Sequence, residues 1–148
     1  MTITFFSTQP YDKNSFSRHS ADFPFQLDFR EEKLTPRTAR LVTEGSVICV
    51  FVNDHVDREV LQVLQQQQVR LIALRCAGFN NVDLEAASDF GIRVVRVPAY
   101  SPHAVAEHAL AMIMTLNRKT HKAYNRIREQ NFSLSGLLGS DLYGKTVG

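Results

Sequence analysis

The residues best placed to do chemistry run from Arg75 to Asn81, with the sequence Arg-Cys-Ala-Gly-Phe-Asn-Asn. They follow a short apolar segment and precede a helix that we expect from about Val82. Ligands of open parallel sheets bind beyond the carboxyl ends of the strands, which is where this loop would lie. Gly78 has no Cβ, so a ligand can come close to the backbone.

Successive N–H groups in such a turn can form a concave site for an anion. The positive N-terminal end of the following helix would point the same way. The loop therefore predicts a site for a small carboxylate. The alternative is an ordinary strand-to-helix turn, in which Gly78 supplies a positive φ and Asn80 or Asn81 caps the helix.

A second segment, Pro98-Ala99-Tyr100-Ser101-Pro102, follows the next expected strand. Tyr100 could present its hydroxyl to a polar ligand beside the first loop, or it could cover the core as an aromatic lid. Val105, in the first turn of the helix expected after Pro102, could form an apolar wall of the same crevice. Ordinary helix packing explains Val105 equally well.

Other kinds of site are not indicated. The 148 residues contain no GxGxxG motif, no Ser/His/Asp arrangement and no spacing typical of a metal site. The net charge is +2 with scattered basic residues, which argues against a nucleic-acid surface. No apolar run reaches the roughly 18 residues of a membrane helix. The two cysteines lack CxxC spacing, so we expect no metal and a cytoplasmic, reducing location.

Strand and helix patterns alternate along residues 1–100. The run from Val47 to Val52 is apolar on both faces, which is typical of a strand in the middle of a parallel sheet. The alternation predicts an α/β fold: a flavodoxin-like, doubly wound parallel sheet of about five strands. The expected strands are 2–6, 24–29, 47–52, 71–74 and 93–97, and the expected helices are 11–20, 35–45, 57–67 and 82–90.

The pattern changes in residues 101–148. Ser101-Pro102 is a typical helix start, and residues 104–116 are nearly all apolar. We expect one long helix that continues as a polar helix toward Arg128 and packs against another domain or subunit. A loop over 131–143 and a new strand from Gly144 would follow. The sequence thus predicts two parts, residues 1–100 and 101–148.

Three segments, Arg75–Asp83, Val94–Pro102 and Val105–Ala109, together resemble the D-2-hydroxyacid dehydrogenases, the bacterial D-lactate dehydrogenase branch in particular. Residues 51–54, 116–118 and 131–134 agree with the same family. The resemblance extends over essentially the whole chain. It carries several long motifs in the correct order, so it is far more specific than a single glycine pattern.

The resemblance implies hydride transfer between NAD and C2 of a small 2-keto or D-2-hydroxy acid, with pyruvate and D-lactate favoured. It implies that the backbone N–H groups of Ala77 and Gly78 hold the substrate carboxylate. Tyr100 would lie beside the substrate, and Val105 would pack near the nicotinamide. The helix from Pro102 would link the two domains and build a homodimer. Residues 1–100 would form the substrate-binding domain.

The chain also departs from the family pattern. The family's glycine-rich dinucleotide motif and its catalytic arginine, glutamate and histidine have no counterpart here, and members are much longer. Their substrate domain is completed by a returning C-terminal segment. The resemblance therefore implies an N-terminal part that stops at the start of a truncated Rossmann domain, near Gly144, and is inactive alone. The alternatives are a non-catalytic, flavodoxin-like regulatory or NAD-sensing module, and an inactive truncation product.

Overall fold

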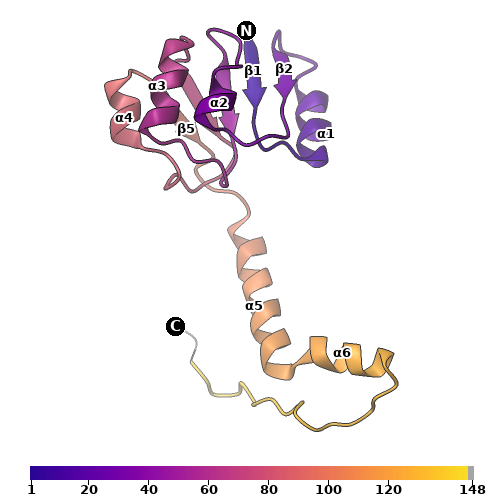
Figure 1. The fold of residues 1–148 in the computed structure, drawn as a ribbon. Helices are drawn as coiled ribbons and strands as arrows, with labels where there is room; N and C mark the ends of the chain where they lie inside the picture. The colour runs from indigo at the N-terminus through magenta and orange to yellow at the C-terminus, as the bar shows by residue number, and fades with distance from the viewer. Residues whose placement is uncertain (147–148) are drawn as a thin grey trace. The chain divides into compact units, whose positions relative to one another are not determined.

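The computed structural model describes residues 1–146, and the chain divides into two compact units, Met1–Tyr100 and Ser101–Gly148 (Figure 1). The first unit holds a sheet and the second holds helices and a loop. No helix in the part of the chain that is described is long and apolar enough to cross a membrane.

The sheet of the first unit has five strands in the order β2-β1-β3-β4-β5, and every neighbouring pair is parallel. The predicted flavodoxin-like, doubly wound fold is therefore confirmed. All four residues of β3 are buried, as the run of apolar residues predicted for the middle strand. The strands are β1 (Thr2–Phe5), β2 (Gln26–Phe29), β3 (Val47–Val50), β4 (Leu71–Leu74) and β5 (Arg93–Arg96).

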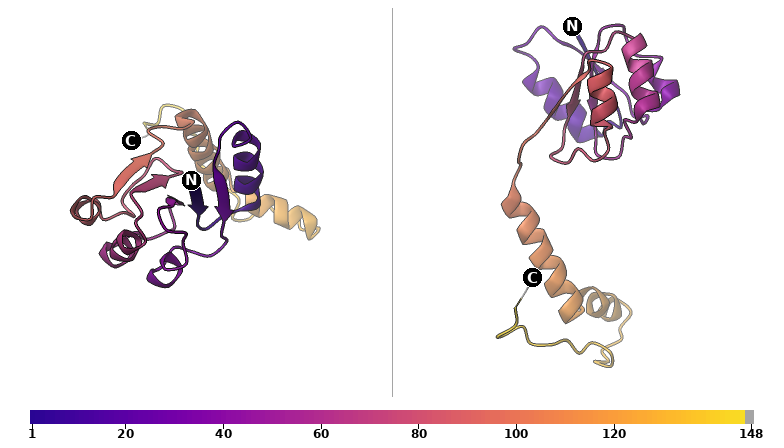
Figure 2. Two further views of the ribbon diagram at one scale, coloured as in Figure 1. Left: turned by 90° about the horizontal axis from the view of Figure 1, so that it is seen from above. Right: turned by 90° about the vertical axis from the view of Figure 1, so that its left-hand side faces the viewer.

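Four helices connect the strands of this unit. Figure 2 shows α1 on one face of the sheet and the other three on the opposite face. The core lies under those three, where α3 buries four apolar residues, Val60, Leu61, Val63 and Leu64, on one side. The helices are α1 (Pro10–His19), α2 (Pro36–Ala39), α3 (Arg58–Gln66) and α4 (Leu84–Asp89).

The helix predicted over 35–45 is wrong in length, because α2 ends at Ala39. Thr35 caps its start as predicted, accepting a hydrogen bond from the Thr38 N–H. The segment then turns away, since Val42 packs into the core and the Gly45 N–H donates to the Gln67 carbonyl at 2.8 Å. A core contact and a long-range hydrogen bond thus replace the later turns of the predicted helix.

The sheet face that carries α1 is covered unevenly. Over β1 and β2, the rings of Phe5 and Phe16 lie 4.6 Å apart, so the helix packs closely there. Over β5, Val95 and Val97 are 49% and 39% exposed. Both faces of a doubly wound sheet are normally covered, so the part of this face near Val95 and Val97 lacks cover from residues 1–100.

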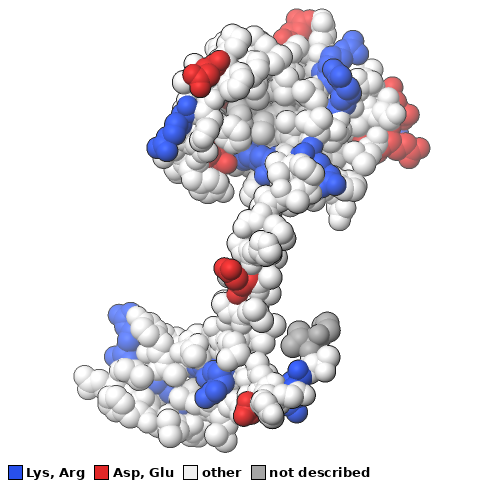
Figure 3. Space-filling view, turned by 180° about the vertical axis from the view of Figure 1, so that it is seen from behind, with Lys and Arg blue, Asp and Glu red and all other residues white. Residues whose placement is uncertain are grey.

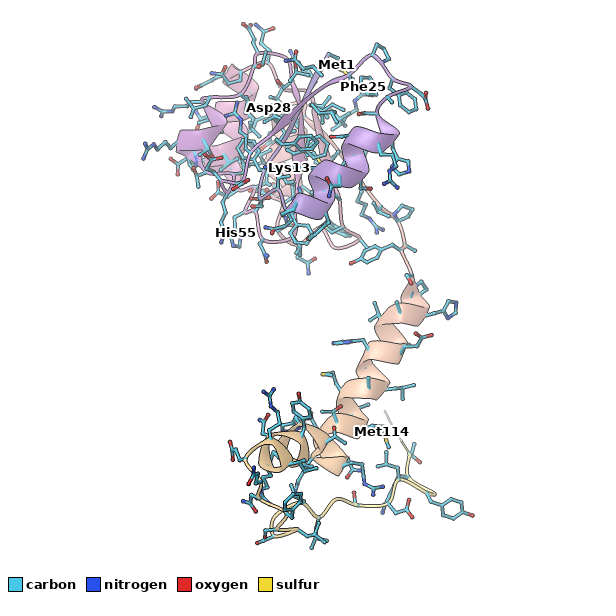
Figure 4. All side chains as sticks on the ribbon, turned by 90° about the vertical axis from the view of Figure 1, so that its right-hand side faces the viewer. Met1, Lys13, Phe25, Asp28, His55 and Met114 are labelled. Atoms are coloured by element: carbon cyan, nitrogen blue, oxygen red, sulfur yellow. The ribbon has the colours of Figure 1, made fainter. Side chains whose placement is uncertain are left out.

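The second unit contains two helices, α5 (Pro102–Arg118) and α6 (Thr120–Arg128). The single helix predicted to run toward Arg128 is therefore wrong. Lys119 adopts a left-handed conformation (φ 54°) and its carbonyl accepts from the N–H groups of Lys122 and Ala123, so it ends one helix and caps the next. The side chains of α5, Met114 among them, project from the helix on all sides (Figure 4).

The loop after α6 is held by side chains of both helices. The Asn117 amide donates to the Ser140 carbonyl and accepts from the Ser140 N–H, at 2.7 and 2.9 Å. Arg126 donates to the carbonyls of Ser133 and Ser135. The strand predicted from Gly144 does not form over 144–146, and its last two residues lie outside the described part of the chain.

Candidate functional site

Ala77 and Gly78 lie in the loop directly after β4, at the carboxyl edge of the sheet. Within residues 1–146, no protein atom accepts a hydrogen bond from either N–H group. A Cβ built on Gly78 meets nothing within 4 Å, and Gly78 does not have a positive φ. The ordinary-turn alternative supposed that Gly78 supplies a positive φ, and the structure contradicts this part of it. The loop thus presents two free amides, with open space at Gly78, and this arrangement suits the approach of an anion.

The helix after this loop begins later than predicted, at Leu84 rather than Val82. Its cap is Asp83, whose carboxylate accepts from the Ala86 N–H at 2.9 Å, so the asparagine cap of the ordinary-turn alternative is wrong. Asn81 instead donates from its side chain to the carbonyls of Phe51 and Asp54. An anion bound at this loop would therefore depend on the loop amides rather than on a helix that starts at Val82.

Arg96, the last residue of β5, connects the two loops that sequence analysis singled out. Its Nη1 donates to the Ala77 carbonyl at 3.0 Å and to the Pro98 carbonyl at 3.2 Å. The guanidinium carbon lies 5.3 Å from the centre of the Phe79 ring, within the range of a cation–π contact. One exposed side chain thus couples the loop of Gly78 to the segment that leads to Tyr100.

Beneath the loop lies a buried arginine, Arg75, whose side chain is 8% exposed. Its Nη2 donates to the carbonyls of Phe6 and Ser7 at 2.9 and 2.8 Å and lies 3.4 Å from the Asp12 carboxylate. The guanidinium carbon lies 5.0 Å from the centre of the Phe51 ring. Arg75 therefore fastens the start of the loop to the turn after β1, where its charge faces the Asp12 carboxylate.

Asp54, which is fully buried, holds the loops after β1 and β3 together. Its carboxylate accepts from the Ser7 hydroxyl at 2.7 Å, the Leu34 N–H at 3.0 Å and the Phe51 N–H at 2.8 Å. No individual role was predicted from the sequence for Arg75, Arg96 or Asp54. The available signal was their position, since each is charged and lies at or just after the end of a strand.

The remaining predicted site residues, Tyr100 and Val105, belong to different units. Tyr100 ends the first unit and is 58% exposed, so it does not cover the core of that unit. Val105 lies in the first turn of α5, in the second unit, and is 63% exposed. Their predicted contacts with substrate and nicotinamide stay predictions.

The two cysteines are free thiols. Burial raises the pKa of Cys49 to about 11, while the nearby Arg75 opposes the shift. Burial also raises the pKa of Cys76, whose Sγ donates to the Gly78 carbonyl at 3.3 Å. Both raised values disfavour the thiolate, which is the form that attacks substrates and binds metals. Among the described residues, no group of three His, Cys, Asp or Glu is arranged to hold a metal ion.

Charged side chains of both signs are dispersed on the face of the first unit drawn in Figure 3, without a large area of one sign. Attraction of a small anion would thus come from local groups, namely the free loop amides and Arg96, which donates to the Ala77 carbonyl.

Known proteins resemble this chain along its whole length. A family model described as "D-isomer specific 2-hydroxyacid dehydrogenase, catalytic domain" matches residues 3–133. A "2-hydroxyacid dehydrogenase homolog 1" from Schizosaccharomyces pombe is 55% identical over all 148 residues. The D-lactate dehydrogenase of Escherichia coli is 52% identical over the same length, and its apo-structure superposes with a TM-score of 0.85 over 98% of this chain. A D-lactate dehydrogenase from Aquifex aeolicus, solved with NAD and lactic acid, is 30% identical over 95% of the chain, with a TM-score of 0.74.

The chain spans about half the length of these proteins: 45% of the two sequences, 46% of the Escherichia coli structure and 41% of the Aquifex aeolicus structure. The family match covers most of the chain and includes both loops of the candidate site. The chain therefore belongs to the family of D-isomer specific 2-hydroxyacid dehydrogenases.

Proposed function

We propose that the chain is the substrate-binding, N-terminal part of an NAD-dependent oxidoreductase that interconverts pyruvate and D-lactate by hydride transfer. The observation that carries this proposal is the pair of free amides at Ala77 and Gly78, beside open space at the carboxyl edge of the sheet. These two N–H groups would hold the carboxylate of the acid, and Tyr100 would lie beside it. The likeness to D-lactate dehydrogenases favours pyruvate among the small 2-keto acids.

The chain's own residues do not suit NAD binding by themselves. A dinucleotide is usually held by a glycine-rich turn at a helix N-terminus, and no GxGxxG motif occurs in the 148 residues. Val105 is the one residue that we assign to the cofactor, as an apolar wall beside the nicotinamide. The hydride would come from NADH when pyruvate is reduced and would go to NAD⁺ when D-lactate is oxidised. The role of the residues described here is to bind and orient the acid. We accordingly expect no dehydrogenase activity from the 148 residues alone.

We propose in addition that α5 forms the interface of a homodimer. Its apolar side chains are unusually exposed, which is typical of an interaction surface. The exposed fractions of Val105, Leu110 and Leu116 are 63%, 59% and 68%. The two free thiols agree with a cytoplasmic location, where disulfides are rare.

A chimera tests the proposed activity. Residues 1–148 would replace the matching part of the Escherichia coli relative, and NADH oxidation would be followed with pyruvate and with larger 2-keto acids. We expect the chimera to reduce pyruvate and the 148-residue chain alone to be inactive. The chimera of a Gly78→Val variant, whose added side chain fills the space beside the amides, should bind NADH normally and show a raised KM for pyruvate. A folded chimera that binds NADH and reduces no 2-keto acid would overturn the proposal.

A further inference from the structure

Arg96 is exposed, yet its guanidinium is bonded to the backbone of two loops. A single nitrogen, Nη1, carries two hydrogens, and the carbonyls of Ala77 and Pro98 accept one each, at 3.0 and 3.2 Å. Both carbonyls lie beside residues of the candidate site. The side chain is therefore placed to control the backbone of the site without being part of it.

The bond to Ala77 has a consequence for Gly78. The Ala77 carbonyl and the Gly78 N–H belong to the same peptide unit, which is planar and trans, so the two groups point in opposite directions. A guanidinium that fixes the carbonyl oxygen on one side thus fixes the direction of the N–H on the other. Within the described residues, that N–H has no protein acceptor, so no hydrogen bond of its own fixes its direction.

The same bond also affects how strongly this amide donates. A positively charged donor at the carbonyl oxygen polarises the peptide group, and hydrogen bonds linked through one peptide group strengthen one another. The planar guanidinium can serve both carbonyls at once from fixed directions, which a single flexible ammonium does less well. The contact with the Phe79 ring, 5.3 Å from the guanidinium carbon, further restricts the side chain.

We propose that Arg96 is a positioning residue of the carboxylate site: it orients and polarises the Gly78 amide and sets the distance between the Gly78 loop and the Pro98–Tyr100 segment. The inference rests on the proposed function for its substrate. Its geometric part, the direction of the Gly78 N–H, does not depend on any substrate.

The experiment uses the ¹⁵N-labelled 148-residue chain and two matched variants. Arg96→Met removes every donor while keeping an unbranched side chain. Arg93→Met is the control, since Arg93 is an exposed arginine on the same strand and is not bonded to either loop. Residual dipolar couplings report the direction of each backbone N–H, and titration with pyruvate reports binding at the Gly78 amide.

We expect the Gly78 N–H coupling to change in Arg96→Met and to stay unchanged in Arg93→Met. Pyruvate should shift the Gly78 amide signal of the wild-type chain, and Arg96→Met should weaken this binding by about tenfold, the effect of one charge-assisted hydrogen bond. Arg96→Lys should fall between the two.

The inference is overturned if Arg96→Met leaves the Gly78 coupling as it is in the wild-type chain. It is also overturned if pyruvate binds the wild-type and Arg96→Met chains equally well. If pyruvate does not shift Gly78 even in the wild-type chain, the proposed substrate fails. The couplings then still decide whether Arg96 controls the direction of the amide.

Discussion

Replacing Asp54 by asparagine tests the buried network that supports the candidate site. The two carboxylate oxygens divide the work: Oδ1 accepts from the Ser7 hydroxyl and the Leu34 N–H, and Oδ2 accepts from the Phe51 N–H. An asparagine has one accepting oxygen. In either orientation of its amide, the NH₂ group faces a backbone N–H, which cannot reverse its role. The Ser7 hydroxyl alone can rotate and adapt.

The expected cost follows from these contacts. A buried donor that loses its acceptor costs about 1–3 kcal/mol, and bonds to a neutral acceptor are weaker than bonds to a charged one. With one orphaned N–H and two weakened bonds, Asp54→Asn should lower the free energy of unfolding by about 3 kcal/mol. In a unit of this size that corresponds to a fall in Tm of roughly 15 °C.

Urea unfolding followed by circular dichroism measures the effect. Asp89→Asn is the matched control, because its side chain is 54% exposed and forms only a surface ion pair with Arg58. The control should unfold within experimental error of the wild-type chain. If Asp54→Asn also lies within about 0.5 kcal/mol of wild type, the reasoning about buried acceptors is refuted.

Three further predictions concern single residues. The pKa of Cys49 is raised to about 11 from 9.0, so the stability contributed by the protonated thiol should be complete below about pH 9 and be lost between pH 9 and 11, by up to about 3 kcal/mol. The free energy of unfolding, measured by urea titration, should therefore fall more between pH 8 and pH 11 in the wild-type chain than in Cys49→Ala, and an equal fall in both would contradict the burial argument. Gly78→Ala should unfold like wild type within about 0.5 kcal/mol, because its Cβ meets nothing, whereas Gly91→Ala, at φ +65°, should lose about 1 kcal/mol or more, and thermal melts that rank the two variants the other way would count against this. Asp83→Ala should lose about 1 kcal/mol with its cap bond to the Ala86 N–H, and an unchanged melting curve would show that this cap contributes nothing.

The sequence by itself determined the fold of residues 1–100. Apolar runs of strand length alternate with helix patterns, and that alternation permits few arrangements other than a parallel, doubly wound sheet. The apolar run from Val47 to Val52 predicted the buried middle strand, because a strand that is covered on both faces is apolar throughout. The strand itself ends at Val50, and Val52 is exposed. The positions of the two loops followed, since loops after neighbouring parallel strands meet at one edge of the sheet.

Tertiary structure decided where the local elements end. The helix after Thr35 stops early because Val42 enters the core and Gly45 bonds to the Gln67 carbonyl. Asn81 is recruited to the carbonyls of Phe51 and Asp54, which leaves Asp83 to cap α4. No local pattern contains this information, because the hydrogen bonds of Gly45 and Asn81 join segments that are far apart in the sequence.

The same reason explains what sequence reasoning found and missed at the site. Gly78 was identified because the absence of a Cβ is a property of one position. Arg75, Arg96 and Asp54 were missed because their roles depend on carbonyl and N–H groups of other loops, and a charged residue near the end of a strand is usually a solvated one. In the structure, the Arg75 side chain is buried, Arg96 donates to backbone carbonyls of two loops, and Asp54 is fully buried. The sequence predicted where an anion could bind, and the folded chain determined which side chains hold those loops in place.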